Sequence, residues 1–218
     1  MGKRGPAPRR ENVEWSSAFA YAVGLITTDG CLSPDGRHLS FTSKDVDLIE
    51  TFKQCLDLKN KIGWKIGGFG TIAHYIQFGD KVLYQWLMEI GVTPQKSKTI
   101  GALDIPDEYF FDFLRGHLDG DGTIKSYPDP VYPNSQRLYV AFHSASLSHL
   151  EWLQQRIRSL LELKGFTQKL TGEYALTYAK QESIQLLRSL YYRNDLPCLD
   201  RKRKIAEPYL ISNSMPRW

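Results

Sequence analysis

The chain has 218 residues, 42% of them hydrophobic and 24% charged, with a mean hydropathy of -0.38, as expected for a globular protein that can bury a core. No apolar run approaches the ~20 residues of a membrane-spanning helix, and the N-terminal MGKRGPAPRR lacks the apolar segment of a secretory signal. We therefore expect an intracellular protein, in a bacterial cytoplasm or an organelle, that is not secreted and contacts no membrane. Three widely spaced cysteines match no zinc-binding pattern and indicate reduced, structural thiols: Cys31, Cys55 and Cys198.

The net charge of +4 is modest, but the basic residues are unevenly distributed. Residues 1–12 form a basic leader, rich in Pro and Gly, that we expect to be flexible. A second basic run, Arg201–Lys204, lies near the other end of the chain. Two basic segments that flank an aromatic-rich body favour a phosphate-rich partner.

Residues 13–103 read as helix, two strands, helix, two strands and helix. The first helix is predicted at about Ser16–Thr28, capped by Ser16 or Ser17. The following elements are strands near Cys31–Ser33 and His38–Ser43, an amphipathic helix at about Val46–Leu58, strands Lys61–Phe69 and Thr71–Phe78 that turn at Gly67–Gly70, and a helix Lys81–Ile90.

The same order returns in residues 104–206, followed by a tail at 207–218. AVGLITTDGCL, beginning at Ala22, has a counterpart in LRGHLDGDGTI, beginning at Leu114, which aligns Asp29 with Asp121. The remaining positions match if the second copy has a longer loop, about Ser126–Gln136. Its elements are a helix from Pro106, a strand Gln136–His143, a helix Leu147–Leu163, strands Thr167–Leu170 and Tyr174–Tyr178, and a helix Gln181–Tyr191. The expected fold class is α+β: an internally duplicated αββαββα chain.

Small residues stand one turn apart near the end of each repeated helix: Gly24 and Thr28, then Gly116 and Gly120. Such pairs allow two helix backbones to pack closely. If the two helices pair, Asp29 and Asp121 lie side by side, where their charges repel unless a cation is present. A hard divalent cation, Mg²⁺, fits this place, with the backbone carbonyls of Thr28 and Gly120 as further ligands.

Other readings of the Asp-Gly motifs fail. An EF-hand loop aligned on Asp121 places His117 at its first position and Pro128 at its twelfth, and neither supplies the required carboxylate. The chain contains no Walker or Rossmann glycine loop and no recognisable Ser-His-Asp or Cys-His order.

AVGLITTDG (22–30) and LRGHLDGDG (114–122) resemble the two signature motifs of single-chain LAGLIDADG homing endonucleases, each matching the nine-letter signature at five places. The similarity extends from about Trp15 to Glu207. It implies two antiparallel sheets that form a DNA-binding saddle, with the motif helices at the domain interface. It also implies cleavage of both strands across a minor groove, with short 3′ overhangs.

The resemblance assigns metal-binding acids to Asp29 and Asp121. Lys96 and Lys202, after the last helix of each copy, resemble the family's basic active-site residues, which stabilise charge on the phosphate or polarise the attacking water. Ser43 and Ser144 stand at the strand-end position of a water-organising residue. Two positions depart from the signature: Thr27, where the second copy keeps the acid as Asp119, and His117. Asp119 is interpreted as a capping or interface group, and His117 as a packed interface histidine rather than a catalytic one.

DNA sequence would be read by the strands. The candidates are Arg37, Ser40, Thr42, Lys61, Lys65, Thr71, His74 and Gln77 in the first copy, and Tyr127, Arg137, Tyr139, His143, Gln168, Lys169, Thr171 and Tyr178 in the second. Because alternate strand residues face opposite ways, about half of them should contact DNA. Trp64, Trp86 and Trp152 are expected in the core.

The predicted function is site-specific, metal-dependent DNA cleavage at a long, pseudo-palindromic or asymmetric target, as in intron homing. The expected cofactor is Mg²⁺, with Mn²⁺ as a substitute and Ca²⁺ supporting binding without cleavage. The partner is double-stranded DNA, bound by a monomer. Two alternatives stay open: an intron maturase that binds intron RNA, and a DNA-binding regulator without chemistry. An intein-embedded form is not expected, since the chain starts at its own Met and ends in SMPRW.

Overall fold

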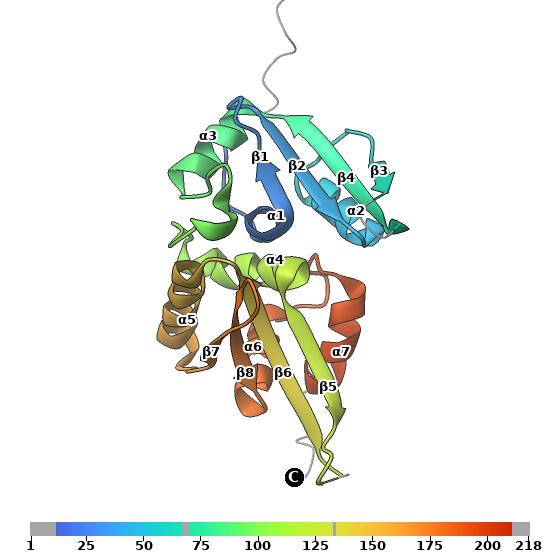
Figure 1. Cartoon of the computed structure of the whole chain (residues 1–218), viewed down its shortest axis with the longest axis vertical. Helices are drawn as coiled ribbons and strands as arrows, with labels where there is room; N and C mark the ends of the chain where they lie inside the picture. The colour runs from blue at the N-terminus through green and yellow to red at the C-terminus, as the bar shows by residue number, and fades with distance from the viewer. Residues whose placement is uncertain (1–11, 67–69, 133, 211–218) are drawn as a thin grey trace, which may run out of the picture.

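The computed structural model describes residues 12–66, 70–132 and 134–210, and contains two α+β halves stacked along the long axis of the molecule (Figure 1). The predicted leader (apart from its last residue, Asn12), the predicted turn at residues 67–69 and the end of the tail (211–218) lie outside the described residues. Within the described residues, no helix is long and apolar enough to cross a membrane.

The first half follows the predicted order of elements. It contains α1 (Ser17–Asp29), β1 (Gly30–Leu32), β2 (His38–Ser43), α2 (Val46–Cys55), β3 (Gly63–Ile66), β4 (Ile72–Gly79), α3 (Lys81–Glu89) and the short 3-10 turn η2 (Lys96–Lys98). Side-chain caps set the starts of two helices: Ser16 accepts from the backbone N–H of Phe19 at 3.1 Å, and Asp80 accepts from that of Leu83 at 3.0 Å.

The second half repeats the first and adds one helix. It contains η3 (Asp107–Tyr109), α4 (Phe110–Asp121), β5 (Thr123–Pro128), β6 (Gln136–Ser144), α5 (Leu147–Leu161), β7 (Phe166–Lys169), β8 (Tyr174–Ala179), α6 (Gln181–Leu190) and α7 (Asp200–Leu210). Strand β5 takes up the start of the predicted loop, and α7 was not predicted as a helix. The basic run Arg201–Lys204 therefore lies in the first turns of α7.

Each half holds one four-stranded antiparallel sheet of the same topology. The strand orders are β1-β2-β4-β3 and β5-β6-β8-β7. The registers also correspond, since Phe41 pairs with Ile76 in the first sheet as Phe142 pairs with Leu176 in the second. The internal duplication predicted from the sequence is thus confirmed at the level of strand pairing.

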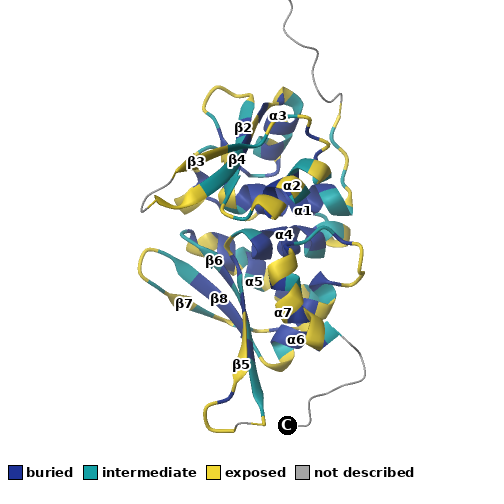
Figure 2. Ribbon diagram, turned by 90° about the vertical axis from the view of Figure 1, so that its right-hand side faces the viewer, coloured by how far each residue is buried: buried dark blue, intermediate teal, exposed yellow. Residues whose placement is uncertain are grey.

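One face of each sheet is covered by helices and the other is open. Leu39, Phe41 and Ile76 point to the covered face of the first sheet and are almost fully buried. In Figure 2 both sheets lie on one side of the molecule, and helices α2, α3, α5, α6 and α7 lie on the other. We call the sheet faces turned away from the helices the open face; because successive side chains alternate, every second strand residue belongs to it.

Helices α1 and α4 cross between the two halves, with their backbones in contact (Figure 1). A Cβ atom on Gly24 would lie 2.7 Å from the backbone nitrogen of His117, and one on Gly116 would lie 2.9 Å from the carbonyl carbon of Tyr21. A Cβ on Gly120 would lie 2.8 Å from the Cβ of Thr28. Glycine at these positions permits the close crossing, as the spacing of small residues predicted.

A buried polar network is centred on Arg115 in the second half. Arg115 is fully buried and donates to Asp112 at 2.7 Å and to the carbonyl oxygens of Leu190 and Pro197, each at 2.8 Å. These bonds satisfy the guanidinium and fix the segment between α6 and α7 against α4. That segment leads directly to the basic run of α7.

Of the three tryptophans expected in the core, two are partly buried and pack against it. Trp86 packs edge-on against Trp15 and Phe19, and Trp152 packs against the rings of the α4 phenylalanines. Trp64, predicted in the core, is instead 66% exposed. Its strand, β3, is the edge of the first sheet, and Ile66 on the same side of that strand is equally exposed, so no helix covers this end of the hairpin.

Candidate functional site

The crossing of α1 and α4 brings the two motif acids together. Asp29 is the last residue of α1 and Asp121 the last of α4, and the residues just before them, Thr28 and Gly120, are in contact. Gly30 and Gly122 follow and begin the return of the chain into the sheets. The fold therefore brings the two acids together at the end of the helix pair, as the sequence predicted.

Asp29 and Asp121 are both exposed to solvent, while the protein around them partly desolvates their carboxylates. Burial raises the pKa of Asp29 to about 7, with the negative charge of Asp121 as the second cause; the ammonium groups of Lys96 and Lys202 act in the opposite direction. Burial also raises the pKa of Asp121, against the lowering effect of Lys202. Two partly desolvated carboxylates that repel one another form a site that favours a cation.

The two predicted active-site lysines occupy equivalent, buried places beneath the acids. The Lys202 ammonium donates to the carbonyl oxygens of Leu118 at 2.5 Å, Asp119 at 2.9 Å and Gly122 at 2.7 Å. Burial lowers its pKa to about 8. Three carbonyl acceptors use all three donors of an ammonium group, so this lysine holds the C-terminal end of α4 rather than facing the open face.

Lys96 does the same for α1. Its ammonium donates to the carbonyl oxygen of Gly30 and, at 3.5 Å, to that of Thr28. A cation at a helix C-terminus is favoured by the helix dipole and satisfies carbonyls that have no partner within the helix. The carbonyl oxygens of Thr28 and Gly120 were predicted as metal ligands. The Thr28 oxygen accepts a hydrogen bond from Lys96, whereas in the second half Lys202 bonds to the carbonyl oxygens of Asp119 and Gly122.

Asp119 and His117 are packed interface groups, as interpreted from the sequence. Asp119 is buried and accepts from the Tyr21 hydroxyl of the other half at 2.8 Å and from the backbone N–H of Leu199 at 2.7 Å. Its burial raises its pKa to about 6. His117 is 1% exposed and stacks on His149 with ring centroids 5.2 Å apart.

Ser43 and Ser144 end strands β2 and β6. Each hydroxyl oxygen accepts from a backbone N–H two residues ahead, that of Asp45 at 3.2 Å and that of Ser146 at 3.1 Å. These bonds shape the turns into α2 and α5. Ser144, unlike Ser43, also lines a small cavity beside Asp121.

Strand register decides which predicted DNA contacts belong to the open face. Two residues that pair across neighbouring strands lie on the same face of the sheet. The register therefore places the following predicted contacts on the open face: Ser40, Thr42, Lys65, Gln77, Tyr127, Arg137, Tyr139, His143 and Gln168. Arg37, Lys61, Thr71 and Thr171 are exposed in the connections between strands. His74, Lys169 and Tyr178 point to the covered side, and Tyr178 is fully buried in the core.

The fold resembles known DNA-cleaving enzymes over its full length. The homing endonuclease I-WcaI bound to its DNA recognition sequence superposes with a TM-score of 0.64 at 12% identity, covering 97% of each chain. I-DmoI in complex with DNA and Mn gives 0.53 at 16% identity, covering 82% of this chain and 98% of that one. The chain has the LAGLIDADG homing-endonuclease fold.

The same LAGLIDADG fold occurs in full-length DUF199/WhiA from Thermatoga maritima, with a TM-score of 0.57 at 13% identity. That match covers 94% of this chain but 66% of the other, so the chain spans less than two thirds of that protein's length. No family model and no curated protein matches the sequence.

Several residues of the open face were not predicted from the sequence. Lys125 pairs with Tyr139 across β5 and β6 and is exposed, but it lies in a strand whose bounds were not predicted. On β4 the open-face residue is Tyr75 rather than the predicted His74. Glu173, just before β8, bonds to His143 and had no signal in the sequence beyond its charge.

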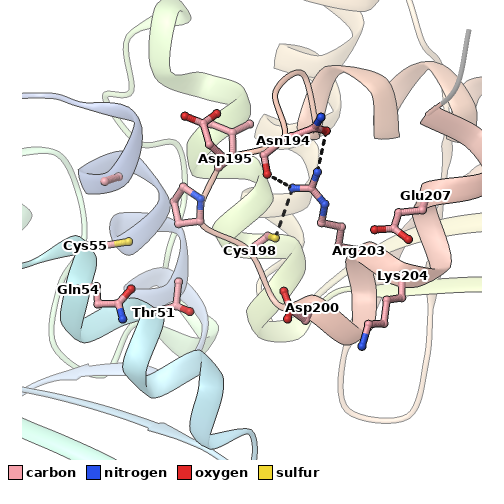
Figure 3. Close-up of a pocket in the computed structure, with 13 residues that line it drawn as sticks. Thr51, Gln54, Cys55, Asn194, Asp195, Cys198, Asp200, Arg203, Lys204 and Glu207 are labelled. Carbon is pink, nitrogen blue, oxygen red and sulfur yellow. Dashed lines mark hydrogen bonds between the residues drawn. The ribbon is translucent and has the colours of Figure 1, made fainter.

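A larger cavity, of about 690 Å³, lies on the helical side, between α2 and the segment that precedes and begins α7. Figure 3 shows Cys55 and Cys198 among its lining residues, with Arg203 donating to the backbone carbonyl and side-chain oxygen of Asn194. The described cysteines are free, as predicted, and burial raises the pKa of the Cys55 thiol to about 12. Neither motif acid lines this cavity, so it is separate from the candidate site.

Proposed function

We propose that this chain is a site-specific DNA endonuclease in which Asp29 and Asp121 hold the divalent metal that hydrolysis requires. The observation that supports this most directly is the meeting of the two acids at the α1–α4 crossing, where burial and the charge of Asp121 raise the pKa of Asp29. The buried carboxylate of Asp119, in contrast, accepts from the Tyr21 hydroxyl and the backbone of Leu199.

The donor set suits a hard cation. Among the described residues, no group of three His, Cys, Asp or Glu side chains could hold a metal. Mg²⁺ needs no such cage, because it binds one or two carboxylates and completes its shell with water and substrate phosphates. When bound, Mg²⁺ stabilises charge on a scissile phosphate and acidifies a water. Mn²⁺ would replace it, and Ca²⁺ would support binding without cleavage.

The other residues of the site bind and position. The open-face side chains of both sheets contact the DNA, the basic ones through phosphate and the others through base edges. Lys96 and Lys202 fix the carbonyl ends of α1 and α4, and so hold the two carboxylates at a constant separation. Because both acids and both sheets belong to one chain, we expect a monomer that recognises a long target and cuts both strands, leaving short 3′ overhangs, as in intron homing.

The test is cleavage of a randomised duplex library with Mg²⁺ by the wild-type protein, Asp29→Asn and Asp121→Asn. Asp47→Asn is the matched control, since Asp47 is exposed in the first turn of α2, away from the site. Wild type and the control should select one long sequence and cut both strands, whereas each motif variant should bind it in Ca²⁺ and leave it uncut.

A second candidate function is DNA binding without cleavage. One observation favours this second function. The ammonium groups of Lys96 and Lys202 donate to backbone carbonyl oxygens, so the predicted active-site cations do not lie on the open face. Selective binding by the wild-type protein with no cleavage in Mg²⁺ or Mn²⁺ would establish this alternative and refute the endonuclease. Retention of a structured intron RNA, with no selective binding of DNA, would indicate a maturase instead.

A further inference from the structure

The surroundings of the two motif acids differ in one respect that the duplication does not predict. In the second half His143, on β6, bonds to Glu173, just before β8. The common register places Thr42 and Ala73 at these positions in the first half. The environment of Asp121 therefore contains an imidazole–carboxylate pair that the environment of Asp29 lacks.

The hydrogen bond within this pair fixes the orientation of the ring. The Nδ1 atom of His143 lies 3.1 Å from a carboxylate oxygen of Glu173. A carboxylate only accepts, so Nδ1 carries the hydrogen and the Nε2 atom of the neutral ring is an acceptor. Nε2 lies 3.5 Å from the hydroxyl of Thr123, two residues beyond Asp121. Nε2, the basic atom of the pair, therefore points towards the segment that follows Asp121.

The pair and the acid share one cavity. It has a volume of about 200 Å³, and His143, Glu173 and Asp121 line it together with Thr28 of the first half. His117 lines it too, and its Nδ1 atom is buried with no hydrogen-bond partner among the described residues. A buried, unpartnered nitrogen beside a polar cavity marks a place where ordered water can bind. His143 itself is only partly buried, so the cavity is accessible from the open face.

We propose that His143, oriented by Glu173, accepts the proton of the water that attacks one of the two scissile phosphates. This rests on the proposed endonuclease function. The water oxygen forms the new bond to phosphorus while its proton moves to Nε2 of His143. The bond from phosphorus to the 3′ oxygen breaks, and that oxygen takes a proton from solvent. At the other strand Thr42 offers no base, so solvent accepts the proton there.

The two strands are then cut by unlike groups. General-base catalysis by a positioned side chain contributes about 10²–10⁴-fold, so the strand served by His143 is cut first and a nicked duplex accumulates. The test uses the duplex selected by the wild-type protein, labelled separately on each strand, in single-turnover reactions at saturating protein. His143→Ala should slow one strand at least about 100-fold and leave the other within about twofold.

A matched control is His74→Ala, because His74 points to the covered side of β4 and does not belong to the open face. It should change neither strand's rate. Free imidazole should restore the slowed strand in His143→Ala, and Glu173→Ala should slow that same strand. Affinity for DNA in Ca²⁺ should be unchanged in His143→Ala, which separates proton transfer from a contact to a base.

A measurement without cleavage tests the orientation of the ring. In ¹⁵N-histidine-labelled protein, the His143 signals, identified by their loss in His143→Ala, should report the Nδ1-protonated tautomer, and Glu173→Ala should remove that preference. Equal slowing of both strands, no slowing of either, or weaker binding with an unchanged saturating rate would overturn the inference and leave the endonuclease function standing. A wild-type protein that cuts no DNA would refute both.

Discussion

Replacing Gly116 by alanine tests how closely the α1–α4 crossing controls the site. The new Cβ would lie 2.9 Å from the carbonyl carbon of Tyr21 and 3.2 Å from the Cα of Gly24, both rigid backbone atoms. Non-bonded carbon atoms prefer about 3.5–4.0 Å, so the helices must separate by roughly 1 Å. Overpacking costs about 1–3 kcal/mol and alanine returns about 1 kcal/mol of helix propensity. With the upper cost expected against rigid backbone, the net loss of unfolding free energy is about 2 kcal/mol.

Urea unfolding followed by circular dichroism measures this loss as a lower midpoint at an unchanged slope. The separation also moves Asp29 relative to Asp121, and a misplacement of about 1 Å can cost about 10²-fold in rate. The control is Gly101→Ala, where the nearest atom to a new Cβ is the Ser148 hydroxyl oxygen at 4.0 Å. If Gly116→Ala unfolds at the same urea concentration as Gly101→Ala and cuts DNA at the wild-type rate, the close crossing does not control the site.

Three further predictions concern titration and the buried lysine. The pKa of Asp29 is raised to about 7, so its ionisation disfavours the folded state as pH rises through 7; Asp29→Asn should therefore unfold at a higher temperature than wild type at pH 8, with a gain that shrinks towards pH 4. Burial lowers the pKa of His149 to about 4, so proton uptake by the unfolded chain should cost wild type about 3 kcal/mol between pH 6.5 and 4, a loss that His149→Leu should not show. Lys202→Met leaves three carbonyl oxygens without their donor and should lower the unfolding free energy by about 3 kcal/mol in urea.

Each of these has its own control or contrary result. Added Mg²⁺ should raise the unfolding temperature of wild type but not of Asp29→Asn; equal shifts would argue against a metal at this acid. Leucine is the natural replacement for His149, because Leu48 stands at the same place in α2, and parallel pH curves for the two proteins would refute the assignment. Lys204→Met, exposed on the same helix, should change stability by less than about 0.5 kcal/mol.

The duplicated elements and the motif acids could be predicted because their signals are local. Apolar periodicity, caps and the repeated Asp-Gly motifs are all legible in short windows of sequence. Helix α7 was missed because its first turns are the charged run 201–204 and it contains Pro208. Strand β5 was missed because it merges with the Pro-rich loop that follows it.

The site could be predicted only in part, because the rest depends on register and on distant contacts. Whether His74 or Tyr75 lies on the open face depends on a register of one residue, which inverts every side chain of a strand. The engagement of Lys202 joins it to Leu118, 84 residues earlier, and nothing near the lysine in the sequence reveals it. The pairing of His143 with Glu173 likewise joins residues from neighbouring strands, 30 positions apart.

The bond between Asp119 and the Tyr21 hydroxyl makes the joining of the two halves directional. Tyr21 corresponds to Phe113 in the repeat, so two second halves paired with each other would bring each Asp119 against a phenyl ring with no donor. By twofold symmetry that loss occurs twice, at about 1–3 kcal/mol for each unsatisfied buried group. Thr27, at the place of Asp119 in the first half, bonds to the carbonyl of Gly24 in its own helix and makes no such demand. Unlike halves are therefore favoured over like ones, which opposes the pairing of two second halves from different chains.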